Sequence, residues 1–137
     1  FYQHLSALKN GEDVNIPIYS YKLHNRTNQT KLVVSCNFLI TEGLFIFHEE
    51  KLRKCFDLKI YLDIDYKTRF NRRLNRDVIE RGRDRDEVEN RFKSTIDVMH
   101  HKYVDKTKEY ADVILKSNDN FEKIEQALNS FLNELEK

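Results

Sequence analysis

The sequence contains little glycine, proline or cysteine. Its 137 residues include no tryptophan. With only three glycines and one proline, they leave little material for a disordered linker. The two cysteines, Cys36 and Cys55, have neither C-x-x-C spacing nor a histidine at ligand spacing, so we expect no zinc site. One disulfide between them is geometrically open. A mixed chain without a cysteine framework is expected to be cytoplasmic.

Long hydrophobic runs and a charge of one sign are also lacking. No apolar run reaches the roughly 20 residues of a membrane helix, and the first ten residues lack the pattern of a signal peptide. Lys and Arg number 24 against 23 Asp and Glu, which gives a net charge of +1. We therefore expect no membrane partner and no nucleic-acid partner. The chain does not begin with Met, so we expect it to be part of a longer protein.

What the sequence does have is a regular alternation of apolar strands and helical segments. Residues 16–23 and 30–35 predict a β-hairpin around the polar stretch 24–29. Continuous apolar runs predict three buried strands, one in the first half of 37–47 that ends at Glu42-Gly43, one at 58–65 and one at 110–115. Helices are expected at 1–8, at 49–54, from 66 to a break near Gly82, at 86–103 and at 121–135. The alternation predicts an α/β fold with a mainly parallel sheet, in which ligands bind at the carboxyl ends of the strands.

The segment 70–84 is rich in arginine. Arg73 and Arg76 lie three residues apart and share one face of a helix, and Gly82 allows a turn that brings Arg81 and Arg83 back to the same space. Guanidinium groups bind phosphate through paired N–H donors and keep their charge. Because acidic residues interleave with these arginines, the pattern alone also fits a solvated helix with salt bridges.

Three further residues are candidates for a binding site. Glu42 follows an apolar run, and a carboxylate there can hold Mg²⁺; the alternative is a polar residue that closes a strand. Tyr19 and His24 lie in the predicted hairpin, where an aromatic face and an imidazole can read the edge of a pyrimidine. The alternative is a packed aromatic and a loop histidine.

The order of the segments resembles the uridine/cytidine kinase family of P-loop nucleoside kinases. The similarity lies in IPIYSYKLHNR (16–26), ITEGLFIF (40–47), DLKIYLDIDYKTRFNRRLNRDVIERGRD (57–84) and YVDKTKEYADVIL (103–115). The resemblance implies a P-loop NTPase fold, a three-layer α/β/α arrangement with a mainly parallel sheet. Residues 1–137 would form part of one such domain, with a nucleoside-binding β-hairpin at 14–35 and an arginine-rich lid at 66–91.

The resemblance also implies an activity and a role for each candidate. The family transfers the γ-phosphate of ATP to the 5′-hydroxyl of uridine or cytidine, with Mg²⁺, in pyrimidine salvage, and it commonly forms homotetramers. By this similarity Tyr19 and His24 read the pyrimidine, and Glu42 helps to place Mg²⁺. The lid residues would divide between the substrates, with Arg73 and Arg91 at the ribose, Arg83 near the base, and Arg76 and Arg81 on the phosphates.

The sequence departs from the family pattern in three ways. It contains no Gly-x-x-x-x-Gly-Lys-Ser/Thr, and the family's catalytic aspartate lies upstream of the matching region, so we expect this chain alone to be inactive. The family also has Gln where this chain has Arg91. Two alternatives stay open: a non-catalytic kinase-like binding or assembly module, and a related P-loop kinase with another acceptor such as phosphoribulose or pantothenate.

Overall fold

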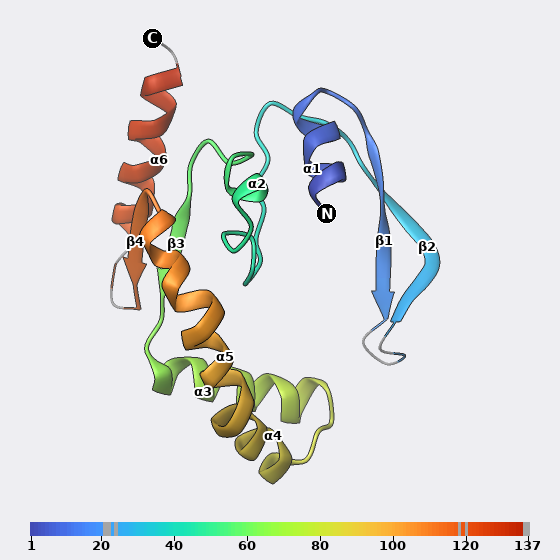
Figure 1. Ribbon diagram of the computed structural model, residues 1–137, viewed down its shortest axis with the longest axis vertical. Helices are drawn as coiled ribbons and strands as arrows, with labels where there is room; N and C mark the ends of the chain where they lie inside the picture. Colours follow the sequence, from blue (N-terminus) through green and yellow to red (C-terminus); the bar gives the residue numbers. More distant parts are fainter. Residues whose placement is uncertain (21–22, 24, 118, 120, 136–137) are drawn as a thin grey trace. The chain divides into compact units, whose positions relative to one another are not determined.

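The computed structural model describes residues 1–20, 23, 25–117, 119 and 121–135, and it divides into two compact units. The first unit is Phe1–Cys55 and the second is Phe56–Lys137 (Figure 1). We describe each unit by itself. The assignment of the whole chain to one partial domain stays a prediction.

The first unit is built on an antiparallel hairpin. Its elements are α1 (Tyr2–Lys9), β1 (Val14–Ser20), β2 (Asn25–Val33) and α2 (Glu50–Arg53). Val14 pairs with Val33 and Ser20 with Asn25, and the register shifts near Pro17, which has no N–H to donate. The predicted hairpin is confirmed. Its second strand begins earlier than expected, because the polar residues from Asn25 onward pair with β1 rather than forming the connection.

The strand predicted in the first half of 37–47 is wrong. Residues 34–47 form turns and irregular backbone in this structure, and much of their apolar surface is exposed, with Ile40 82% and Leu44 67% accessible. A parallel strand forms only where a neighbouring strand accepts and donates its hydrogen bonds. Among the described residues no strand pairs with this segment. The apolar run therefore has the composition of a β-strand, but no described strand pairs with it.

This exposure makes a prediction about stability. Replacing Ile40 with alanine should change the free energy of unfolding of the 137-residue chain by less than about 0.5 kcal/mol, as surface substitutions do. Leu5→Ala is the matched control, because Leu5 lies in the same unit and is 7% exposed, and it should destabilise the chain clearly more. Urea denaturation of both variants measures the difference. A loss of about 2 kcal/mol or more at Ile40 would place that side chain in a core.

The second unit contains a parallel strand pair and a set of helical segments. Strand β3 (Ile60–Asp63) pairs with β4 (Val113–Lys116), with Ile60 opposite Val113. The strands predicted at 58–65 and 110–115 are thus confirmed. The helical segments are α3 (Tyr66–Asn75), the π-helical turns η1 (Arg76–Glu80), η2 (Phe92–Ile96) and η3 (His100–Val104), α4 (Arg85–Arg91), α5 (Asp97–Met99), the 3₁₀ segment η4 (Asp105–Tyr110) and α6 (Phe121–Leu135).

Helix-capping residues define where α3 and α4 begin. Asp65 accepts a hydrogen bond from the backbone N–H of Thr68 at 2.9 Å, and Asp84 accepts one from Glu87 at 2.9 Å. These bonds satisfy backbone donors that the first helical turn leaves open. The bonds from Thr68 also lower the pKa of the Asp65 carboxyl. Between the two helices, Gly82 has a φ of +61°, so the expected break near this glycine is confirmed.

An aromatic core holds these helices together. Phe92 is 2% exposed, and its ring lies 5.4 Å from that of Tyr66 and 5.2 Å from that of Phe70, both in edge-to-face contact. Leu74 and Val88 are buried in the same unit. This packing joins α3 to α4 and η2, and α3 and α4 carry part of the arginine-rich sequence.

The remaining expectations concern thiols and membranes. Cys36 and Cys55 are both free, so the disulfide that the sequence left open does not form in this structure. In the part of the chain that the structure describes, no helix combines the length and the apolar character required to cross a membrane.

Candidate functional site

Three predicted arginines converge on one buried carboxylate. Asp77 is only 1% exposed, and its Oδ1 accepts hydrogen bonds from Arg76 Nε at 3.0 Å and from Arg81 Nη1 at 3.2 Å. Arg73 Nε lies 3.3 Å from Asp77 Oδ2. We call this group, Arg73, Arg76 and Arg81 around Asp77, the arginine cluster.

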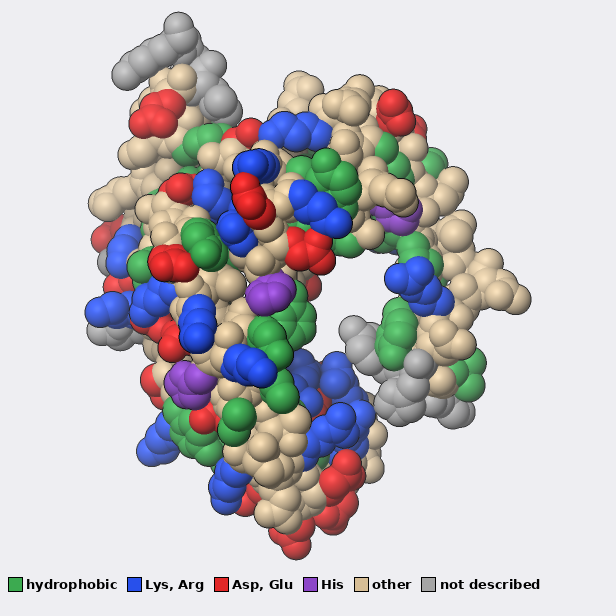
Figure 2. All heavy atoms as spheres, viewed as in Figure 1, with side chains coloured by type: hydrophobic (Ala, Val, Ile, Leu, Met, Phe, Trp, Pro, Cys, Tyr) green, Lys and Arg blue, Asp and Glu red, His purple; other side chains and the backbone are tan. Residues whose placement is uncertain are grey.

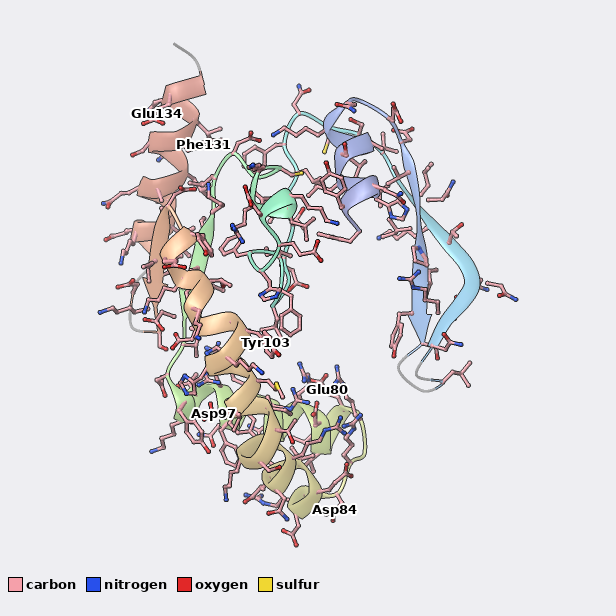
Figure 3. The ribbon with its side chains drawn as sticks, in the orientation of Figure 1. Glu80, Asp84, Asp97, Tyr103, Phe131 and Glu134 are labelled. Atoms are coloured by element: carbon pink, nitrogen blue, oxygen red, sulfur yellow. The ribbon has the colours of Figure 1, made fainter. Side chains whose placement is uncertain are left out.

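The local fold explains why these side chains meet. Arg73 and Arg81 stand four residues before and after Asp77, the spacing that brings side chains together on one helix face. The helix widens into the π-helical turn η1 at this point, and a chain turn follows. Glu80 and Asp84 lie at the two ends of that turn (Figure 3). Arg81 thus shares the space of Arg73 and Arg76, but it does so through helical spacing, because Gly82 follows it in the chain.

The cluster carries an excess of positive charge. Three guanidinium groups face one carboxylate, so two positive charges are not compensated within the group. Burial lowers the pKa of the Arg73 guanidinium, Asp77 acts in the opposite direction, and Arg76, Arg91 and Arg81 lower it further. Lys and Arg side chains gather over the helices of the second unit on the face seen in Figure 2. Such a concentration of cations attracts anions.

Two buried atoms of the cluster lack hydrogen bonds. Arg73 Nε and Asp77 Oδ2 are both inaccessible to solvent, and neither has a hydrogen-bond partner among the described residues. Their 3.3 Å contact is an ion pair without hydrogen-bond geometry. An unsatisfied buried polar group is costly, so this ion pair offsets only part of the cost of burying the two atoms.

Arg83 and Arg91 lie at the border of the cluster. The backbone N–H of Arg83 donates to the backbone carbonyl of Asp77 at 3.0 Å, which ties the turn to η1, and the Arg83 side chain is half-buried. Arg91 is the last residue of α4, and its exposed guanidinium acts on Arg73 electrostatically. The second unit thus gathers the arginines that the sequence singled out.

The other candidates belong to the first unit. Tyr19 lies on β1 opposite Arg26 and is 47% exposed. His24 lies outside the described residues. Glu42 is exposed in the irregular segment that replaces the predicted strand, so it does not end a strand. At Gly43, a Cβ would lie 3.0 Å from Ile46 Cγ2, so the close approach that this glycine allows is to a side chain of its own loop.

Glu42 is the carboxylate that the sequence predicts as a magnesium ligand, and its side chain is exposed. Within the described ranges no group of three His, Cys, Asp or Glu side chains could hold a metal ion by itself. Phosphoryl-transfer enzymes usually hold Mg²⁺ by one or two carboxylates together with water and substrate phosphates. In such an arrangement the protein needs to supply only one accessible carboxylate, and the Glu42 side chain is an accessible carboxylate.

Sequence reasoning missed Asp77. It counted this aspartate among the acidic residues of a solvated helix, whereas its side chain is the most deeply buried of the charged groups described. One signal could have found it. Asp77 is four residues from both Arg73 and Arg81, so a helix through this segment must bring both cations to the same carboxylate.

Comparison with known proteins agrees with this architecture. Residues 1–122 match the model of the Phosphoribulokinase / Uridine kinase family, so the chain belongs to that family, whose fold is that of the P-loop NTPases. The chain is 39% identical over 137 residues to the uridine kinase of Borreliella burgdorferi strain ZS7, covering all of this chain and 66% of that protein. It is also 40% identical over 113 residues to the uridine kinase of Clostridium tetani strain Massachusetts / E88, covering 82% of this chain and 54% of that protein.

These matches confirm the family predicted from the order of the sequence segments. The chain spans just under two thirds of the length of the Borreliella relative, which is 66% covered.

Proposed function

We propose that the complete protein transfers the γ-phosphate of ATP to the 5′-hydroxyl of uridine or cytidine. The observation that carries the proposal is the arginine cluster, in which three guanidinium groups share one carboxylate. Family membership and relatives named uridine kinase support the choice of reaction. We further propose that the enzyme acts in the cytoplasm and forms a homo-oligomer. The location and the oligomeric state are proposed from the resemblance alone.

The proposed chemistry depends on placing charge rather than on covalent catalysis. During phosphoryl transfer, negative charge is spread over the oxygens of the transferred group and of the leaving group. Arg76 and Arg81 would donate hydrogen bonds to these oxygens. Both side chains are partly exposed, at 42% and 29%, so they can reach a ligand while Asp77 holds them from behind.

The nucleoside would be held by other residues. On the resemblance, we assign the ribose to Arg73 and Arg91, and we assign Arg83, Tyr19 and His24 each to the base. Tyr19 is accessible enough to contact a ligand. A tyrosine offers both a flat face for stacking and a hydroxyl for hydrogen bonding, which suits a pyrimidine.

Glu42 would supply one carboxylate oxygen to Mg²⁺. The ion, when bound with ATP, neutralises charge on the phosphates. The exposed position of Glu42 leaves the remaining ligands to water and to the phosphates themselves.

A phosphorylation assay of the complete protein tests the proposal. With ATP and Mg²⁺ we expect uridine and cytidine to give their 5′-monophosphates, and adenosine to give no product at the same concentration. Binding of uridine without turnover would instead favour the non-catalytic binding module. Turnover of another small-molecule alcohol, with none of uridine or cytidine, would favour a related kinase.

A further inference from the structure

The buried carboxylate at the centre of the arginine cluster has a role that its neighbours do not. Asp77 is 1% exposed, whereas Arg73, Arg76 and Arg81 keep 27%, 42% and 29% of their side-chain surface accessible. A ligand in solution can therefore reach the arginines but not Asp77. Whatever Asp77 contributes must act through them.

We propose that Asp77 is a positioning residue, which fixes the guanidinium groups of Arg76 and Arg81 at the spacing needed to bind one phosphoanion and holds Arg73 beside them at the ribose. This inference rests on the proposed function and deepens it. Without the carboxylate, three cations held this close would repel one another and turn outward to water. With it, each guanidinium is anchored on its inner side.

The number of donors and acceptors supports this role. Three guanidinium groups offer roughly fifteen N–H donors, and one carboxylate offers about four acceptor sites. Asp77 alone therefore cannot satisfy every donor of the cluster. Because three guanidinium groups face this one carboxylate, the ligand class that fits is a polyanion such as the phosphate chain of a nucleoside triphosphate.

The backbone of the same residue fixes the turn. The Asp77 carbonyl accepts the Arg83 N–H at 3.0 Å, across the turn that contains Gly82. The side chain of Asp77 thus holds three arginines, and its main chain positions a fourth. This occurs within the π-helical turn η1, a local widening of a helix that is often found at functional sites.

A double-mutant cycle in the complete protein tests the inference. Asp77→Asn keeps the shape and removes the charge, and we expect it to lower kcat by about 10- to 100-fold, the scale of a small displacement of catalytic groups. Because Asp77 acts through the arginines, Asp77→Asn combined with Arg81→Ala should be little worse than Arg81→Ala alone. Multiplying effects of the two substitutions would make Asp77 a purely structural residue and overturn the inference.

Asp97→Asn is the matched control. Asp97 forms an ion pair with Arg69 at 3.0 Å in the same unit, away from the cluster, and is labelled in Figure 3. Its loss should leave kcat unchanged. If Asp77→Asn does not fold, as judged by circular dichroism, the cycle is run with Asp77→Glu, which keeps the charge but changes the reach. Full activity of Asp77→Glu would also overturn the inference.

A separate measurement distinguishes this inference from the proposed function. If the wild-type protein phosphorylates no nucleoside, the proposed function fails, and titration calorimetry with inorganic tripolyphosphate tests the positioning role directly. We expect Asp77→Asn to bind tripolyphosphate about tenfold more weakly than the wild type, the scale expected when an orienting partner is lost. Equal or tighter binding by the variant would show that Asp77 only opposes anions by its charge.

Discussion

Replacing Arg81 with alanine should lower kcat of the complete protein by about 30- to 1,000-fold, which corresponds to about 2–4 kcal/mol of transition-state stabilisation. Arg81 donates to Asp77 at 3.2 Å and keeps 29% of its side chain accessible, so it is anchored and able to reach a ligand. A donor that is already oriented gains most when charge develops in the transition state. Steady-state kinetics with uridine and ATP measure the effect.

Arg85→Ala provides the comparison. Arg85 is four residues further along, is 69% exposed, and pairs with Glu89 at 3.0 Å rather than with Asp77. Its removal deletes an arginine from the same unit without touching the cluster, so kcat should stay within about twofold of the wild type, as surface pairs contribute little. If Arg81→Ala changed kcat no more than Arg85→Ala, Arg81 would have no part in phosphoryl transfer.

Replacing Phe92 with alanine should reduce the free energy of unfolding by about 3–5 kcal/mol. The ring is 2% exposed and contacts Tyr66 and Phe70 edge to face, so its removal leaves a cavity between α3 and η2. Urea denaturation followed by circular dichroism measures the loss, ideally with the complete protein.

Ile79→Ala is the control for this experiment. Ile79 lies in η1 and is 78% exposed, so the same kind of truncation should cost less than about 0.5 kcal/mol. Similar losses at the two positions would mean that Phe92 is not the centre of a packed core. If the destabilised Phe92→Ala variant still folds at low temperature, its activity there would also show whether the arginine cluster tolerates movement of α4.

The two parallel strands and the helix break at Gly82 could be predicted, because the residues within each segment indicate its structure. The runs around Ile60 and Val113 became a parallel pair because each offers the other apolar contacts and hydrogen bonds. The break near Gly82 was predictable because glycine alone adopts positive φ without strain. The start of β2 was placed too late, since strand pairing overrode the weak β propensity of Asn25 and its polar neighbours.

The strand prediction in 37–47 failed for a reason that the composition of this segment does not reveal. Its apolar residues have strand propensity, but a buried strand exists only where another strand and two covering layers meet it. Phe47 alone of its large side chains is buried, while Ile40 is mostly exposed. The position of Glu42 was mistaken for the same reason, because the predicted strand end was the argument for it.

For the candidate site, the sequence identified the cations and not the anion that organises them. Arginines are conspicuous as a group, and their convergence follows from helical spacing. Asp77 was overlooked because a single acidic residue among mixed charges usually faces water. Its burial and its spacing of four residues from Arg73 and Arg81 distinguish it from Asp84, which caps α4 from an exposed position.

The turn at Gly82 is constrained by handedness rather than by size. A Cβ built on this residue meets nothing within 4 Å, so there is ample space for a side chain. What opposes a side chain is the chirality of ordinary amino acids, whose mirror images would enter this backbone conformation freely. Glycine is used here because it is achiral. Among ordinary residues, asparagine, which tolerates the left-handed conformation best, is therefore the replacement that the turn can accept most readily.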